Sequence, residues 1–148
     1  MDKDLRIDGA VANSLSLSVD ELRHSYPPYT VQPSFETDNG IISPVFVGAW
    51  LWDILRNAQV TADPSSDRRL RVVAQANDGV HCTIRWNELD PAVTDRLILV
   101  AYERDGEPIA KGGPLRLVVP GDKQGRRFLR SLVLLTVLTQ ITEENSES

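Results

Sequence analysis

Turn-forming residues divide this 148-residue sequence into short apolar segments, and this division constrains its fold more than any other feature. Pro27 and Pro28 end any helix before them, because proline lacks a backbone N–H and disfavours helical geometry in the preceding residue. Residues 77–79 (NDG) predict a hairpin turn with positive φ, and residues 104–107 (RDGE) predict another tight turn. Many short strands with two or three short helices predict an α+β fold.

Most of the apolar segments predict strands. Residues 97–102 (LILVAY) are almost continuously apolar and predict a buried central strand. Residues 5–8 alternate apolar and polar side chains before Gly9 and predict a short edge strand. Further extended segments are predicted at residues 13–17, 29–35, 41–47, 70–76, 80–86, 115–119 and 132–138. Pro33 implies that the second of these is an edge strand or an irregular strand.

Two segments predict helices. Ser18 and Glu21 have the spacing of a capping box, so a short helix should follow as far as Arg23 or His24. Residues 48–59 (GAWLWDILRNAQ) predict the strongest helix of the chain. Its apolar face repeats at helical spacing and consists of Leu51, Ile54, Leu55 and Ala58.

Length and charge limit the classes of function. The length predicts one domain, residues 1–141, followed by a disordered acidic tail at residues 142–148. A net charge of −5 argues against nucleic-acid and membrane partners, which favour a broadly basic face. No apolar run is long enough for a bilayer, and the first residues lack the apolar core of a signal peptide. We therefore expect a cytoplasmic protein, unless an export signal has been removed; the single cysteine agrees with that compartment.

Basic residues gather in one short segment of this acidic chain. Residues 111–130 contain six lysines and arginines but one acid, Asp122, a local net charge of +5. The same segment contains glycines and a Pro-Gly turn, which can present backbone N–H groups and positive charge to an anion. Two interpretations stay open from the residues alone: a site for a small anionic ligand, or a solvated basic loop between two strands.

Recognisable catalytic and metal-binding motifs are missing from the sequence. His81 and Cys82 are adjacent on a predicted strand, so their side chains point to opposite faces and cannot share a metal. Cys82 is better explained as a small buried apolar residue than as a nucleophile. The residues alone therefore predict an anion-binding domain without a metal site.

Four segments, in order, resemble the molybdopterin-binding domain of the sulfite oxidase family. They are LRIDGAV with LSLSVDEL, FVGAWLWDIL, QANDGVHCTI and YERDGEPIAKGGPLRLVVPG, the last being the closest match. The resemblance spans residues 5–139 and implies a single mixed, β-rich α+β domain with a few short helices. It also implies a molybdopterin cofactor, which carries a phosphate tail.

The same resemblance implies which residues bind the cofactor. Arg116 would point at the pterin or its phosphate, and Gly121 would form the turn beside it. The implied cofactor-binding set is Lys111, Arg116, Gly121, Gly125, Arg127 and Arg130. Arginine suits this role because its planar guanidinium binds phosphate through two parallel hydrogen bonds.

One departure from the family pattern concerns the metal. The position of the family's metal-binding cysteine corresponds to Thr37, and a hydroxyl is a poor molybdenum ligand beside a thiolate. We therefore expect this domain to bind a pterin or another phosphate-bearing anion without normal molybdenum catalysis. The alternatives are an active molybdenum-pterin oxidoreductase and a non-catalytic protein-interaction module.

Overall fold

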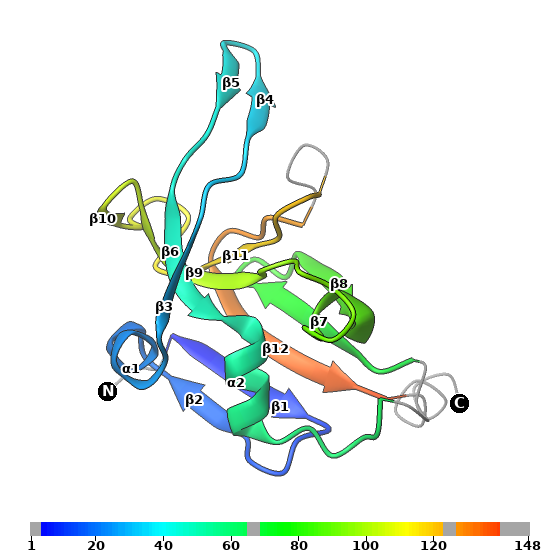
Figure 1. The fold of residues 1–148 in the computed structure, drawn as a ribbon. Helices are drawn as coiled ribbons and strands as arrows, with labels where there is room; N and C mark the ends of the chain where they lie inside the picture. Colours follow the sequence, from blue (N-terminus) through cyan, green and yellow to red (C-terminus); the bar gives the residue numbers. More distant parts are fainter. Residues whose placement is uncertain (1–3, 65–68, 123–126, 140–148) are drawn as a thin grey trace.

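The computed structural model of the chain describes residues 4–64, 69–122 and 127–139. They form one α+β domain with two short α-helices, as predicted (Figure 1). Of its two larger sheets, the first is mixed and the second is antiparallel. The predicted disordered tail, residues 142–148, and the predicted site residue Gly125 lie outside the described residues. Within the described ranges, neither α-helix has the length and apolarity needed to cross a membrane.

The first sheet has five strands. Their order is β2 (Leu15–Leu17), β1 (Leu5–Gly9), β12 (Leu132–Leu138), β7 (Arg71–Ala76) and β8 (His81–Arg85). The prediction that the first strand lies at an edge is wrong, because β1 pairs with β2 on one side and runs parallel to β12 on the other. The alternation that suggested an edge reports burial of one face, where Leu5 and Ile7 are buried. It carries no information on the number of neighbouring strands.

The second sheet is organised around β9 (Leu99–Arg104). The order is β10 (Glu107–Pro108), β9, β6 (Phe46–Trp50) and β3 (Pro28–Val31), and β11 (Arg116–Val118) also pairs with β9. The predicted central strand, β9, is confirmed. The segment predicted as an edge or irregular strand forms β3 at the edge of the sheet, and this strand ends before Pro33. Alternate side chains of β9 enter two different apolar clusters, so both of its faces are buried.

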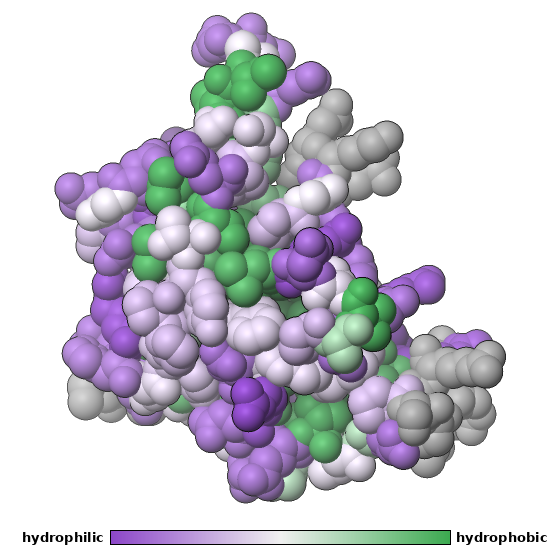
Figure 2. Space-filling model, in the orientation of Figure 1, coloured by the Kyte–Doolittle hydropathy of each residue, from purple (hydrophilic) through white to green (hydrophobic). Residues whose placement is uncertain are grey.

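The β7–β8 hairpin has the turn that the sequence predicts, and a second hairpin projects from the domain. Gly79 between β7 and β8 has φ +91°, which confirms the predicted positive-φ turn. Strands β4 (Phe35–Thr37) and β5 (Gly40–Ile42) pair only with each other and project from the body of the domain (Figure 1). Apolar surface is visible on this second hairpin, where Ile41 is 71% exposed (Figure 2).

Helix α1 (Val19–Ser25) begins at the predicted capping box. The Ser18 hydroxyl accepts a hydrogen bond from the Glu21 backbone N–H at 3.1 Å, and the Glu21 carboxylate accepts one from the Ser18 N–H at 3.2 Å. These two bonds satisfy donors that the first helical turn leaves without partners.

Replacing Ser18 by alanine removes one of these bonds. We expect the free energy of unfolding to fall by about 1 kcal/mol, the usual effect of losing an N-cap hydroxyl. Urea denaturation of the wild type and of Ser18→Ala measures the difference. Ser16→Ala, at an exposed position of β2, is the matched control and should change stability by less than about 0.5 kcal/mol. Equal effects from the two changes would contradict the capping role.

Helix α2 (Leu51–Ala58) is shorter than predicted. Residues 48–50, expected at its beginning, belong to strand β6. Apolar residues precede the helix in an unbroken run, so periodicity alone could not separate buried strand from buried helix. The predicted apolar face is confirmed, and all four of its residues are buried: Leu51, Ile54, Leu55 and Ala58.

The core consists of two apolar clusters. The larger joins α2 to both sheets, and includes Ile7 and Leu135 of the first sheet with Val100 of the second. The smaller contains Phe46, Leu99, Ala101, Ile109 and Val118. Ile109 directly follows β10 and is buried in this smaller cluster. Its packing therefore holds the beginning of the segment that leads to Lys111.

Candidate functional site

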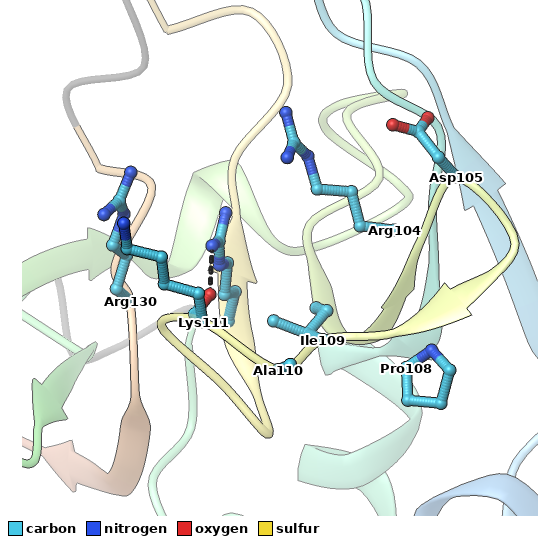
Figure 3. Close-up of a pocket in the computed structure, with 8 residues that line it drawn as sticks. Arg104, Asp105, Pro108, Ile109, Ala110, Lys111 and Arg130 are labelled. Atoms are coloured by element: carbon cyan, nitrogen blue, oxygen red, sulfur yellow. Dashed lines mark hydrogen bonds between the residues drawn. The ribbon is translucent and has the colours of Figure 1, made fainter.

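A concave site of about 320 Å³ lies beside the β9–β10 turn, which we call the cationic pocket. Its walls come from the end of β9, the segment after β10, the start of β11 and the residue two positions before β12 (Figure 3). The lining residues are Arg104, Asp105, Pro108, Ile109, Ala110, Lys111, Arg116 and Arg130. Four of these carry positive charge and one carries negative charge, so the pocket favours anions.

The β9–β10 turn places Arg104 in the pocket. Asp105 and Gly106 have φ of 53° and 84°, which reverses the chain immediately after β9. The Asp105 carboxylate accepts a hydrogen bond from the Val45 N–H at 2.9 Å, and the Asp105 N–H donates to the Val45 carbonyl at 2.7 Å. The one acid of the pocket therefore fixes the turn against the chain that leads into β6.

Arg116 bends back onto the loop before it. Its Nη2 donates to the Lys111 carbonyl at 2.6 Å, and its Nε donates to the Gly112 carbonyl at 3.3 Å. Arg130 is held nearby because the backbone N–H of Ser131 donates to the Gly112 carbonyl at 2.9 Å. Hydrogen bonds to backbone carbonyls thus fix the Arg116 guanidinium, and a backbone hydrogen bond of the next residue positions the chain at Arg130.

Gly112 allows these two arginines to share the loop. Its φ is +72°, and a Cβ there would lie 3.0 Å from both Arg116 Nη2 and Arg130 Cδ. Only glycine combines this backbone geometry with the required space. The second glycine of the pair at 112–113 is also required by packing, because its Cβ would overlap the Ile109 backbone.

Positive charge in the pocket is uncompensated. Among the residues that the structure describes, Arg104, Lys111, Arg116 and Arg130 form no ion pair with a carboxylate. Burial, and then the charges of Arg130 and Arg104, lower the pKa of Arg116. Nε of Arg104 is buried without a hydrogen-bond acceptor. Clustered like charges cost free energy, which an anion in the pocket would relieve.

A second arginine cluster, which we call the ion-pair network, has the opposite character. Arg127 donates to Glu88 at 2.6 and 2.8 Å and to Asp122 at 2.7 and 2.8 Å. Arg96 pairs with the same two acids at 3.3 and 3.4 Å. Hydrogen bonds from Arg127 hold the pKa of both carboxyls below their usual range. The two positive charges of this network are therefore balanced by two negative charges.

Thr37 and Cys82 both lie outside the lining of the cationic pocket. Thr37 is exposed on the projecting hairpin, where its hydroxyl donates to the Gly40 carbonyl at 2.6 Å. Cys82 is half-buried on β8, and burial raises the pKa of its thiol. Within the described ranges, no three potential ligands among His, Cys, Asp and Glu come together for a metal. The donors present suit a phosphate or pterin, but no protein thiolate faces the pocket.

The structure divides the residues predicted from the sequence. Lys111, Arg116 and Arg130 meet in the cationic pocket, whereas Arg127 belongs to the ion-pair network. Gly121 lies beside that network, because a Cβ there would lie 3.5 Å from Arg96. The role of these residues in binding stays a prediction.

Arg104 is the pocket residue that sequence reasoning missed. The charge count covered one contiguous segment, and Arg104 precedes that segment by seven positions. A signal was available: Arg104 stands directly before an Asp-Gly turn. Such a turn folds the following chain back beside the strand, which brings an arginine at the strand end close to later residues.

Comparison with protein families gives one match. The model of the family described as oxidoreductase molybdopterin binding domain matches residues 2–145, nearly the whole chain. Among curated proteins, none matches this sequence.

Proposed function

Since this chain belongs to the oxidoreductase molybdopterin binding domain family, we propose that its cationic pocket binds the phosphate of a molybdopterin or of another phosphate-bearing anion. We further propose that the chain does so without normal molybdenum catalysis. The first part rests on the uncompensated charge of the pocket, and the second rests on the donor atoms that the chain supplies.

The uncompensated charge is the observation that carries this proposal. The ion-pair network shows that this chain can neutralise clustered arginines with its own acids, at distances of 2.6 to 3.4 Å. The cationic pocket, by contrast, leaves four cations beside a single acid that is already bonded to the backbone. Retaining such a cluster is typical of a site whose counter-charge arrives with a ligand.

The pocket residues offer complementary donors. Arg116 uses Nη2 and Nε on the loop carbonyls, which leaves its second terminal nitrogen for a phosphate oxygen. Among the described residues, the Arg130 guanidinium has no carboxylate partner, and Lys111 adds a compact charge. These residues would orient a phosphate and hold its charge without any proton transfer.

Metal chemistry would need a ligand that the pocket lacks. A bound molybdopterin supplies dithiolene sulfurs for molybdenum, and the family adds a cysteine thiolate. This chain has one cysteine, Cys82, which lies on β8 outside the pocket, and a hydroxyl at Thr37. A hydroxyl is a harder and weaker donor for this metal than a thiolate.

Removing Arg116 or Arg130 should weaken phosphate binding. Hydrogen bonds to charged groups contribute about 1.5–3 kcal/mol, so we expect Arg116→Ala and Arg130→Ala each to raise the Kd for inorganic phosphate about tenfold to a hundredfold. Isothermal titration calorimetry at low ionic strength measures the change. Arg6→Ala removes the same charge from an exposed pair on β1 and should leave the Kd unchanged. A wild-type protein that binds neither phosphate nor pterin would overturn the proposal.

Metal analysis tests the second part of the proposal. Protein purified from a host that synthesises the cofactor should contain much less than stoichiometric molybdenum, even where oxidation releases a fluorescent pterin. Stoichiometric molybdenum would instead support an active oxidoreductase.

A further inference from the structure

The cations of the cationic pocket form two separate centres. Lys111 and Arg130 lie together on one side, Arg104 lies on the other, and Ile109 lies between them (Figure 3). The first centre comes from the loop before β11 and the residues before β12, whereas Arg104 ends β9. Different parts of the fold therefore position the two centres.

The first centre is compact. The Arg116 guanidinium donates to the Lys111 carbonyl at 2.6 Å, which fixes these two residues against each other. A Cβ on Gly112 would lie 3.0 Å from both Arg116 Nη2 and Arg130 Cδ, so the two arginine side chains cover the same face of one residue. Three cations thus gather around one loop, where a phosphate group could accept hydrogen bonds at several of its oxygens.

Arg104 is a distinct second centre. The Asp105–Val45 hydrogen bonds fix the turn that follows it, and its buried Nε has no acceptor. Arg130 perturbs the pKa of Arg116 more than Arg104 does, which agrees with the separation in Figure 3. Arg104 lines the pocket and pairs with no carboxylate among the described residues, so its charge is available to a second ligand group.

On the premise of the proposed function, we infer that the ligand of this pocket carries a diphosphate: one phosphate binds Lys111, Arg116 and Arg130, and the adjacent phosphate binds Arg104. Charge supports this assignment. A single phosphate ester carries about −1.5 to −2 at pH 7, which leaves part of the excess charge of four cations and one acid uncompensated. A second phosphate supplies the remainder and pairs with the Arg104 guanidinium.

Pocket size agrees with a ligand of this kind. A cavity of about 320 Å³ lies at the small end of the range of about 300–1,000 Å³ for small-molecule sites. The apolar lining residues are Pro108, Ile109 and Ala110, and Ile109 lies between the two centres (Figure 3). Each phosphate therefore has its own cations, and the bridge between them crosses an uncharged floor.

Titration with inorganic phosphate and inorganic pyrophosphate, at matched ionic strength, tests the inference. For the wild type, we expect pyrophosphate to bind at least about tenfold more tightly than phosphate. Arg104→Met keeps an unbranched apolar stem and removes the donors. We expect this variant to lose the preference for pyrophosphate while its Kd for phosphate changes less than about threefold. Arg130→Met should weaken the binding of both anions. Arg6→Met, the exposed control, should change neither Kd.

The outcomes separate this inference from the proposed function. If phosphate and pyrophosphate bind the wild type equally, or Arg104→Met weakens both anions by the same factor, the diphosphate assignment is wrong while phosphate binding stands. If neither anion binds the wild type, the proposed function fails with it. Melting temperatures measured without ligand show whether Arg104→Met is folded. Arg104→Lys keeps the positive charge, so it should keep part of the preference for pyrophosphate.

Discussion

Replacing Gly48 by alanine is expected to lower the free energy of unfolding by about 3 kcal/mol or more. Gly48 lies in β6, opposite Ala101 of β9, at the centre of the second sheet. An alanine Cβ would lie 2.2 Å from the Val100 carbonyl oxygen and 2.5 Å from Ala101 Cα. Both atoms belong to the backbone, so relief requires the two strands to separate and weakens their hydrogen bonds.

Chemical denaturation measures this effect, and Gly79→Ala is its control. Gly79 has a positive φ of +91° but open space where a Cβ would lie, so alanine there is strained without overlapping any atom. We expect this control to cost about 1 kcal/mol. If Gly48→Ala is no more destabilising than Gly79→Ala, close packing of β6 on β9 is not the reason for the glycine.

Replacing Arg127 by methionine is expected to cost about 2 kcal/mol of stability at neutral pH. Arg127 makes hydrogen bonds to both Glu88 and Asp122, and these carboxylate side chains are only 23% and 11% exposed. Removing one partner of a buried pair costs about 3–5 kcal/mol. We reduce that figure because Arg96 remains beside both acids and solvent reaches part of the network.

The pH dependence of stability should change with the same substitution. Arg127 lowers the folded-state pKa of Glu88 and Asp122 below their unfolded values. Groups of this kind stabilise the fold above the unfolded pKa, and that stability is lost as the pH falls through the folded pKa. The wild type should therefore lose stability below about pH 4.5, where carboxyl groups titrate, and Arg127→Met should lose less over the same range.

Urea titrations between neutral pH and about pH 3 measure both effects. Arg6→Met serves as the control, because the Arg6–Asp8 pair is exposed and should contribute little. Identical stability profiles for the wild type and Arg127→Met would show that the network does not stabilise the fold. An increase in phosphate affinity in Arg127→Met would indicate that Arg127 also influences the cationic pocket.

Arg127 and Arg130 show how close in sequence two different roles can lie. Arg127 is paired with acids from two other parts of the chain, and Glu88 is 39 positions away. Three residues later, Arg130 has no acid partner among the described residues and lines the cationic pocket. Counting both as one basic segment did not distinguish an arginine that pairs with acids from one that lines the cationic pocket.

Local chemistry was enough for several parts of the fold. The capping box at Ser18 and the apolar face of α2 depend on residues a few positions apart, so the sequence alone determined them. The same holds for the buried strand β9, whose apolar run excludes a solvated face. The family was also recognisable from four short segments, and the family comparison confirms it.

Only the tertiary structure decided where α2 begins, that β1 lies between two other strands, and which cations share a pocket. Gly48 belongs to a strand because β9 lies against it, and β1 is interior because β12 returns from the far end of the chain. Arg104 joins Lys111, Arg116 and Arg130 through a chain reversal, while Glu88 and Asp122 neutralise Arg127. Electrostatic interaction depends on distance in space, and only the folded chain sets that distance.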